Sequence, residues 1–393
     1  MTPQADRIAS LDVLRGLGIL GILAVNATFF AMPLAAMMEP EVLGPMDADS
    51  TTAWGAVRIF FERKFVTLFS MLFGASMLLV GGPDKSDPER NRFLNRRLGW
   101  LLLFGLIHGA LIWYGDILLT YAIAGFITAQ FRHWQPARLF AVGAGVYLLF
   151  ALFEAANYWL MAFMPEAAEQ GMAMFSPEAA RAEVAAFQSS LAGAQMANLK
   201  NWAVLLGFSV FYIPSTIALM MVGMGLFKTG VLAARRGVGL YLVLTLLGGA
   251  ALAAIGWAVL EELAAGEAKA TAQAVHMTLN GLFAPVVTLG YIGLVCLILK
   301  TPLRTLTRPL AATGQMAFTN YITQSLMMTG VFWAGRGLGL FGTMSYAEQA
   351  LVVMGIWVLQ LIWSPIWLSF FRYGPLEWIW RRLTYAGPVA FRR

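Results

Sequence analysis

The sequence is poor in cysteine, histidine and charge. It has one cysteine and three histidines in 393 residues, and only 12% of its residues are charged. Cys296 has no partner for an intramolecular disulfide and three scattered histidines do not make a metal site, so we expect neither. Hydrophobic residues make up 59% of the chain and the mean hydropathy is +0.69, which excludes a water-soluble fold. The composition predicts an all-α, polytopic membrane helical bundle.

Ten apolar runs follow one another along the chain. They cover residues 11–32, a second stretch that ends at Val80, and then 98–113, 117–131, 139–164, 202–227, 238–260, 279–299, 310–333 and 351–371. Each run is a predicted transmembrane helix, because a span needs ~20 mostly apolar residues. The first run is too long for the apolar core of a signal peptide, so we interpret it as a span. The short third and fourth runs either both cross or form a re-entrant pair, which leaves ten or eight crossings.

The basic residues alternate between the two sides of the predicted bundle. Of the 27 lysines and arginines, four lie in the connections of one side, three lie in the second run, and all the others lie in the connections of the opposite side. Basic residues accumulate on the cytoplasmic side of membrane proteins. The alternation therefore predicts that both termini are cytoplasmic. The net charge of +6 marks this topology rather than the binding of nucleic acid.

We expect residues 1–393 to form a single transmembrane domain. An N-terminal half, residues 1–164, precedes an external loop, residues 165–200, and a C-terminal half, residues 201–393. The loop contains the helix-capping pattern Ser176-Pro177-Glu178 and predicts an amphipathic helix on the outer surface. The segment that starts at Tyr373 predicts a second amphipathic helix, on the cytoplasmic face. Both helices are expected to anchor the chain at the membrane surfaces.

Polar side chains inside the first run are candidates for a functional role, because placing a charged side chain in the hydrocarbon region of the membrane costs at least ~2.5 kcal/mol. Asp12 and Arg15 lie one helical turn apart, and Asn26 returns to nearly the same face. The three side chains either form a stripe that binds a ligand, or combine an ion pair at the interface with an asparagine that joins helices.

The second run begins with a cluster of charges, namely Arg58, Glu62, Arg63 and Lys64. Such a segment cannot face lipid at depth and must face protein or water. Arg58 and Glu62 are spaced to pair on one helix face, which favours a structural network. The alternative is a cationic lining for an anionic ligand, a site to which we assign Glu62 and Lys64.

His108 is the residue that we single out for chemistry. It lies about ten residues into a span, so it is expected ~15 Å deep in the membrane. An imidazole there can act as a general base or as a nucleophile that carries an acyl group. Asp116, just past the following turn, can orient the ring. The alternative is a hydrogen-bonded histidine of the protein core. His133 and His276 are expected near helix ends and do not compete for this role.

The ninth run is rich in amides and hydroxyls and is expected to face the interior of the bundle. Asn320 and Gln324 lie one turn apart on one face. They either hold a polar substrate or lock helices together.

Several motifs of the chain resemble those of the YeiB family of bacterial inner-membrane proteins, whose C-terminal domain has no known function. The matching stretches are Ser10-Leu11-Asp12-Val13-Leu14-Arg15-Gly16 with Asn26, Phe61-Glu62-Arg63-Lys64-Phe65, Gly105-Leu106-Ile107-His108 through Gly115-Asp116, Gly314-Gln315-Met316-Ala317 through Gln324-Ser325, and Tyr373-Gly374-Pro375-Leu376-Glu377-Trp378. The resemblance covers nearly the whole chain. It implies a multi-pass protein of the bacterial inner (cytoplasmic) membrane.

The Leu-Asp-x-x-Arg-Gly start is also similar to that of the heparan-α-glucosaminide N-acetyltransferase-like transmembrane acyltransferases. This resemblance implies transfer of an acyl group from cytoplasmic acyl-CoA, such as acetyl-CoA, to an unknown extracytoplasmic acceptor, with His108 in the role of the intramembrane histidine. The hypothesis assigns Asp12, Arg15, Asn26, Glu62 and Lys64 to acyl-CoA, His108 and Asp116 to catalysis, and Asn320 and Gln324 to the substrate. A transporter or exporter without acyl transfer, or a membrane scaffold, is the alternative. Membrane lipids are expected partners, nucleic acid is not, and a homodimer is compatible with the sequence.

Overall fold

The protein is all-helical. A computed structural model describes residues 8–164 and 175–393, and within these ranges it contains helices and no β-strand. The α-helices are α1 (Ala9–Ala31), α2 (Ala48–Phe60), α3 (Lys64–Gly81), α4 (Pro88–Ile107), α5 (Leu118–Thr128), α6 (Pro136–Phe163), α8 (Pro177–Ser189), α9 (Leu191–Lys228), α10 (Val238–Ala264), α11 (Lys269–Leu299), α12 (Arg308–Gln315), α13 (Ala317–Phe332), α14 (Tyr346–Phe370) and α15 (Pro375–Tyr385). Shorter turns are η2 (Leu34–Met37), η3 (His108–Ile112), η4 (Ala129–Phe131), η6 (Gly266–Ala268) and η7 (Pro302–Thr307).

Seven of the described helical segments are long and apolar enough to cross a membrane, so the chain is a multi-pass membrane protein. They are α1, α2 together with α3, α6, α9, α10, α11 and α14. The remaining predicted spans are charged, short or interrupted. They correspond to α4, α5, and the pair α12 and α13, which is broken at Met316. The count of ten crossings and the cytoplasmic position of both termini therefore stay predictions.

The α4–α5 pair reaches as far as the end of α1. The ring of Trp113, in the turn between the two helices, stacks on Phe30 with 3.9 Å between ring centroids. The hydroxyl of Tyr114 donates a hydrogen bond to the carbonyl of Phe29. Because Phe29 and Phe30 lie in the last turn of α1, the tip of the α4–α5 pair is level with that end of α1.

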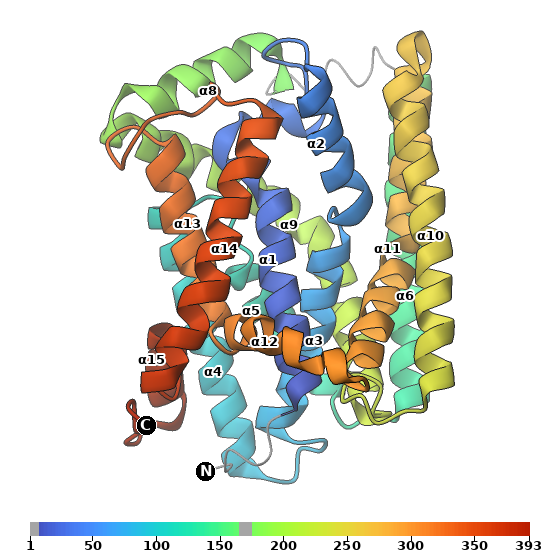
Figure 1. Ribbon diagram of the computed structural model, residues 1–393, viewed down its shortest axis with the longest axis vertical. Coiled ribbons are helices and arrows are strands. Elements are labelled where there is room, and N and C mark those ends of the chain that lie inside the picture. Colours follow the sequence, from blue (N-terminus) through green and yellow to red (C-terminus); the bar gives the residue numbers. More distant parts are fainter. Residues whose placement is uncertain (1–7, 165–174) are drawn as a thin grey trace.

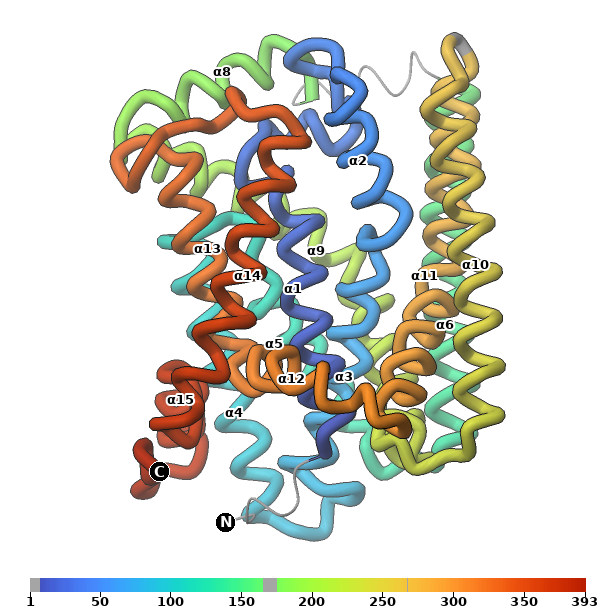
Figure 2. Tube along the Cα trace, in the orientation of Figure 1, coloured from blue at the N-terminus to red at the C-terminus, as the bar shows by residue number. Residues whose placement is uncertain are grey.

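Helix α1 lies in the middle of the bundle (Figure 1). Helices α13 and α14 lie on one side of it, α2 and α3 lie on the other, and α12 crosses its lower part, while α6, α10 and α11 form a packed group at one edge. The tube view in Figure 2 shows that the short helix α12 runs across the long axis of the molecule. The start of α1 and the C terminus lie at the same end. This shared end agrees with the prediction that both termini face one side.

Glycines allow α1 and α12 to touch backbone to backbone. A Cβ atom on Gly16 would lie 2.0 Å from the carbonyl oxygen of Leu310, and one on Gly314 would lie 1.9 Å from that of Asp12. Helix pairs in membranes commonly pack in this way, because small residues let the backbones approach. The crossing fixes α12, and with it α13, against α1.

We expect Gly16→Ala to destabilise the protein by about 1–3 kcal/mol, because the added methyl group has no space at this crossing. The measurement is the midpoint of thermal unfolding of the purified protein in detergent. Gly249→Ala is the matched control, since a Cβ atom at this α10 glycine meets nothing within 4 Å. Equal midpoints for the two variants would contradict the tight crossing.

The predicted external loop, residues 165–200, is shorter than expected. Residues 165–174 lie outside the described residues, and the capped helix predicted at Ser176 is present as α8, with the Ser176 hydroxyl accepting a hydrogen bond from the amide of Ala179. Helix α9 begins at Leu191, well before the predicted start of the span at residue 202. The sequence pattern misplaced this boundary because polar residues of the first turns of α9 contact other helices rather than water. The predicted second surface helix is present as α15.

Candidate functional site

The structure brings three polar side chains into one hydrogen-bonded row inside the bundle. His108 Nδ1 lies 2.8 Å from Asp116 Oδ1, and His108 Nε2 lies 2.9 Å from the hydroxyl oxygen of Ser325. The side chains of all three residues are buried. The prediction that Asp116 contacts His108 is confirmed. Ser325, on α13, completes an arrangement of serine, histidine and aspartate that we call the triad.

The direction of the triad hydrogen bonds follows from their chemistry. An ionised carboxylate only accepts hydrogen bonds, so His108 Nδ1 donates to Asp116. In the neutral ring Nε2 is then the acceptor, and the Ser325 hydroxyl donates to it. Asp116 also accepts from the backbone amides of Leu118 and Leu119, at 3.2 and 2.8 Å, which fixes the carboxylate at the start of α5. A serine oxygen that can give its proton to an oriented imidazole is the arrangement of an activated nucleophile.

His108 lies where α4 changes into a single π-helical turn, η3, which runs from His108 to Ile112. The amide of Trp113 donates to the carbonyl of His108 at 2.8 Å and closes this wide turn. A π turn inserts an extra residue and turns side chains away from the regular α-helical positions, and such turns are frequent at functional sites. The lack of a side chain at Gly109 lets η3 pack closely against Trp202, because a Cβ atom at residue 109 would lie 2.2 Å from the indole nitrogen.

Side chains from two other segments satisfy the carbonyl groups that η3 leaves free. Asn198 donates to Gly109 O at 3.0 Å, and Gln195 donates to Ala110 O at 2.6 Å. Arg336 donates to the carbonyls of Ile112 and Leu111, both at 2.6 Å. Free carbonyls at membrane depth are costly, so these donors support the geometry that aims His108 at Ser325. Gln195 and Asn198 lie in the segment predicted as an external loop, and their spacing in the sequence does not indicate this role.

Helix α13, which carries Ser325, starts at a carboxylate cap. Glu377 accepts hydrogen bonds from the amides of Phe318 and Thr319, at 2.6 and 3.0 Å, and from the Thr319 hydroxyl at 2.6 Å. A negative charge at a helix N-terminus is favourable because the first amides there have no helical partner. Burial raises the pKa of Glu377, and the hydrogen bonds from Thr319 and Phe318 oppose that shift. The cap ties α15 to the helix that carries the serine.

Two further polar atoms near the triad have no hydrogen-bond partner among the described residues. They are the indole nitrogen of Trp113 and the hydroxyl of Tyr321, and both are buried. The rings lie 6.1 and 5.0 Å from the His108 ring, measured between centroids. Buried donors are normally paired, so two unpaired ones beside one histidine mark a place where a polar ligand atom would gain hydrogen bonds.

Asn320 and Gln324, predicted to hold the substrate, make helix-to-helix hydrogen bonds in the structure. Asn320 donates to Thr313 O at 3.0 Å and to the Ser364 hydroxyl at 3.1 Å, and it accepts from Trp363. Gln324 donates to Ile19 O at 3.2 Å and to Gln360 at 2.8 Å. Both side chains are buried. These contacts join α13 to α1, α12 and α14, and a role in binding substrate stays a prediction.

Only two members of the stripe predicted on α1 contact each other. Arg15 and Asp12 form an ion pair at 3.3 Å near the start of the helix. Asn26 lies within α1 and its side chain is half-buried. Gln324 contacts Ile19, between Arg15 and Asn26, and Ser325 is the next residue on α13, so the triad lies level with the middle of this stripe. Glu62 and Lys64 are not brought to the triad; they contact α11 in a separate cluster.

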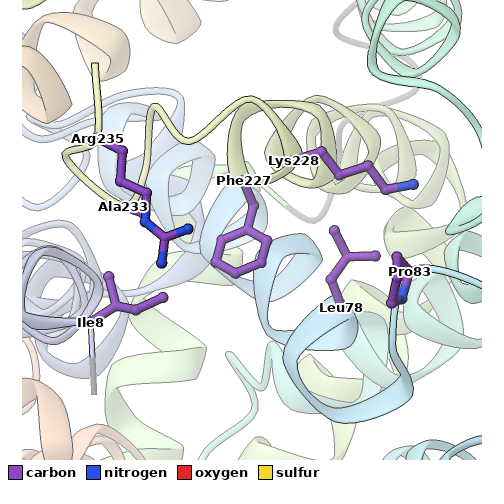
Figure 3. Close-up of a pocket in the computed structure, with 7 residues that line it drawn as sticks. All are labelled: Ile8, Leu78, Pro83, Phe227, Lys228, Ala233 and Arg235. Atoms are coloured by element: carbon purple, nitrogen blue, oxygen red, sulfur yellow. The ribbon is translucent and has the colours of Figure 1, made fainter. Parts of the chain in front are cut away.

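Two hollows lie on the surface of the described residues. The first, of about 280 Å³, is lined by Ile8 at the start of α1 and by Phe227, Lys228 and Arg235. Figure 3 shows Phe227 between the two basic side chains. The second, of about 420 Å³, lies between α12 and α14 and is lined by Arg308, Gln315 and Arg393 among others.

Neither hollow is lined by a triad residue.

Comparisons with known proteins place the chain in a family. Residues 224–387 match the family described as "Protein of unknown function (DUF418)". The chain is 31% identical to the uncharacterized protein YxaH of Bacillus subtilis, over 98% of this chain and 96% of that protein. It is 30% identical to the uncharacterized protein YeiB of Escherichia coli, over 98% of each. An uncharacterized 39.9 kDa protein encoded in the amylase 3' region of Bacillus acidopullulyticus is 27% identical, over 97% of this chain and 94% of that protein.

No solved structure matches the chain. The identity to two relatives extends over almost the full length, as the motifs of both halves predict. The chain belongs to the YeiB family.

Proposed function

We propose that the protein is a membrane acyltransferase of the bacterial inner membrane, which takes an acyl group from cytoplasmic acyl-CoA and passes it to an acceptor at the outer face. The observation that carries this proposal is the row from Asp116 through His108 to Ser325, with hydrogen bonds of 2.8 and 2.9 Å inside the bundle. This row supplies a nucleophile, a general base and a group that orients the base, which are the parts that acyl transfer needs.

The first step forms an ester on Ser325. The serine oxygen attacks the carbonyl carbon of the thioester while His108 Nε2 accepts the hydroxyl proton. The carbon–sulfur bond then breaks, and the proton passes from Nε2 to the departing thiolate. Asp116 stabilises the charged imidazole during this step, because its carboxylate accepts from Nδ1.

The second step moves the acyl group to the acceptor. His108 takes the proton of an acceptor hydroxyl or amine, which attacks the ester carbonyl, and the proton returns to the Ser325 oxygen. In both steps a negative charge develops on the carbonyl oxygen. The unpaired donors of Trp113 and Tyr321 are the groups that we assign to this oxygen, because preorganised donors stabilise such a charge.

The donor binds at the end of the molecule where α1 starts. Acyl-CoA carries phosphates, which arginine side chains bind well. Arg235 and Arg308 line the two hollows, and Arg15 lies in the first turns of α1. The stripe from Arg15 to Asn26 then leads the pantetheine arm to the level of Ser325. In this proposal Asn320 and Gln324 position α13 rather than contact the acceptor, because their polar atoms already bond to neighbouring helices.

We expect purified wild-type protein to bind acetyl-CoA or a longer acyl-CoA, measured by calorimetry in detergent. Arg15→Ala should weaken this binding by about tenfold, the effect of losing ~1.5 kcal/mol from a hydrogen bond to a charged group. Arg181→Ala is the control, since Arg181 is an exposed arginine of α8, at the other end of the molecule. Absence of acyl-CoA binding to the wild type would remove the basis of the acyl-transfer proposal.

A transporter is the second candidate, and interrupted helices favour it. Two stretches of the bundle are broken, between α2 and α3 and between α12 and α13. Broken helices often form binding sites at the midplane of transporters. A transporter would keep its activity in the Ser325→Ala variant, whereas the acyltransferase would lose it.

A further inference from the structure

A second buried cluster of polar side chains lies where α2 and α3 meet the α10–α11 hairpin, and acyl transfer makes no use of it. We call it the α10–α11 cluster. Its members are Arg58, Glu62, Lys64, Glu262, His276 and Asn280. All of them except Glu62 are buried, and the Glu62 side chain is 22% exposed. Ionisable groups inside a membrane bundle are rare and usually mark a path or site for ions or protons.

His276 stands between two carboxylates. Its Nδ1 lies 2.7 Å from Glu262 Oε2, on α10, and its Nε2 lies 3.8 Å from Glu62 Oε2, in the break between α2 and α3. His276 Nε2 is buried and has no hydrogen-bond partner among the described residues. Thus one ring nitrogen is hydrogen-bonded to a carboxylate, and the other faces a second carboxylate at a distance too long for a hydrogen bond.

With a neutral ring, the contact between His276 Nε2 and Glu62 has no hydrogen-bond donor. A carboxylate accepts hydrogen bonds, so Nδ1 carries the proton that it shares with Glu262. In a neutral ring Nε2 would then present a lone pair to the oxygen of Glu62, with no donor between them. A proton on Nε2 instead makes the ring positive and turns this 3.8 Å contact into an ion pair with the carboxylate.

The other charges of the cluster balance one another. Arg58 lies 3.3 Å from Glu62 and 3.8 Å from Glu262, and Lys64 donates to Asn280 at 2.8 Å. Asn280 in turn donates to Glu62 Oε2 at 2.9 Å. Two basic and two acidic side chains thus cancel, and the proton on His276 is an added charge that can bind and leave.

The remaining charged groups around the cluster are paired elsewhere. Arg63 lies 2.6 Å from Glu154 of α6, and Lys269, at the start of α11, lies 2.8 Å from Glu39. Lys269 and Glu39 are both more than 40% exposed. They mark the end of the hairpin that faces water. Glu262 lies in the last turn of α10, next to the exposed Glu261, so the cluster is close to the same water.

We propose that His276, Glu262 and Glu62 form an intramembrane proton-binding site, which exchanges its proton with water at the end of the α10–α11 hairpin. The bound proton sits on His276 Nε2 and forms a salt bridge between the ring and Glu62, at 3.8 Å, while Nδ1 stays hydrogen-bonded to Glu262. The site lies on the opposite side of α1 from the triad, and the proposal holds whether or not the protein transfers acyl groups.

The test is solid-state nitrogen NMR of the full chain in lipid bilayers at neutral pH, with labelled histidine. The chain has three histidines, so the ring signals of His276 are assigned by their loss in His276→Gln, or by elimination with His108→Gln and His133→Gln if that variant does not fold. We expect two protonated ring nitrogens for His276. An unprotonated ring nitrogen in the wild type would overturn the proposal.

The Glu62→Gln variant tests the bridge itself. It removes the carboxylate that faces Nε2, so we expect one ring nitrogen of His276 to lose its proton and to give the signal of a neutral imidazole. Glu261→Gln is the matched control, because Glu261 is an exposed carboxylate beside Glu262 and should leave the His276 signals unchanged. If His276 stays doubly protonated in Glu62→Gln, the proton does not bridge to Glu62 and the proposed site is wrong.

Discussion

Replacing His108 by glutamine is expected to lower the rate of acyl transfer by ~10²- to 10⁴-fold, the usual contribution of a positioned general base. Glutamine keeps hydrogen-bonding groups between Asp116 and Ser325, but it cannot accept and return the serine proton. The measurement is the release of free CoA thiol from acyl-CoA by the purified protein, followed with a thiol reagent. Binding of acyl-CoA should change little, because His108 is distant from the basic residues that hold the nucleotide.

His133→Gln is the control for this variant. His133 is exposed in the connection between η4 and α6, so its replacement should leave thiol release unchanged. The thermal unfolding midpoint of both variants shows whether the fold is preserved. A folded His108→Gln protein with the wild-type rate would mean that His108 is a hydrogen-bonded core residue and not a base.

We expect the second large effect from Arg336→Met, which should lower the stability of the protein. The guanidinium of Arg336 donates to the carbonyls of Leu111 and Ile112 and to the side chain of Gln195, at distances of 2.6 to 2.7 Å. Methionine keeps the apolar part of the side chain but leaves these acceptors without a donor, which should cost about 2 kcal/mol. The expected result is a clearly lower midpoint of thermal unfolding in detergent, and also slower thiol release, because η3 carries His108.

Arg181→Met serves as the matched control, since Arg181 lies exposed on α8. Its unfolding midpoint should stay within the error of the wild-type value. If Arg336→Met is equally stable, water or detergent replaces the lost donors, and the π turn does not depend on Arg336.

Local patterns in the sequence predicted much of the helical framework. The apolar runs correspond to helices, the Ser176 cap starts α8, and Arg58 pairs with Glu62 one turn away at 3.3 Å. Asp116 lies eight residues from His108, across a single turn of the chain, and its contact with the ring was also predictable. These features arise from residues close together in the sequence, so they can be predicted from residue types and their spacing.

Contacts between distant segments were not predictable in the same way. Ser325 is 217 residues from His108, and no periodicity in either segment signals that they meet. The same holds for His276 and Glu62, which the sequence placed in separate spans without a connection. The density of polar residues around Ser325 in the ninth run was the available signal, but it did not distinguish the proposed nucleophile from Asn320 and Gln324. Ser325 differs from these two residues only through the packing of α13 against α4 and η3, which places its hydroxyl against His108.

The sequence pattern also did not predict the interruptions within the membrane-spanning segments. Arg63 adopts a positive φ of 64°, unusual for a residue with a side chain, and separates α2 from α3. Its guanidinium is held by Glu154, 91 residues away. A helical pattern continues through this point in the sequence, so a contact with another helix, rather than local preference, accounts for the interruption.

If Ser325 is the nucleophile, it carries the acyl group as an ester between the two steps, and peptide mass spectrometry can detect this ester. Purified protein is mixed with acyl-CoA, quenched in acid, digested and searched for a peptide with the added acyl mass. We expect an acyl ester on the peptide that contains Ser325 in the wild type, and no such ester in His108→Gln or Ser325→Ala. Thiol release with the acyl group on His108 instead, or undiminished thiol release by a folded Ser325→Ala protein, would contradict it.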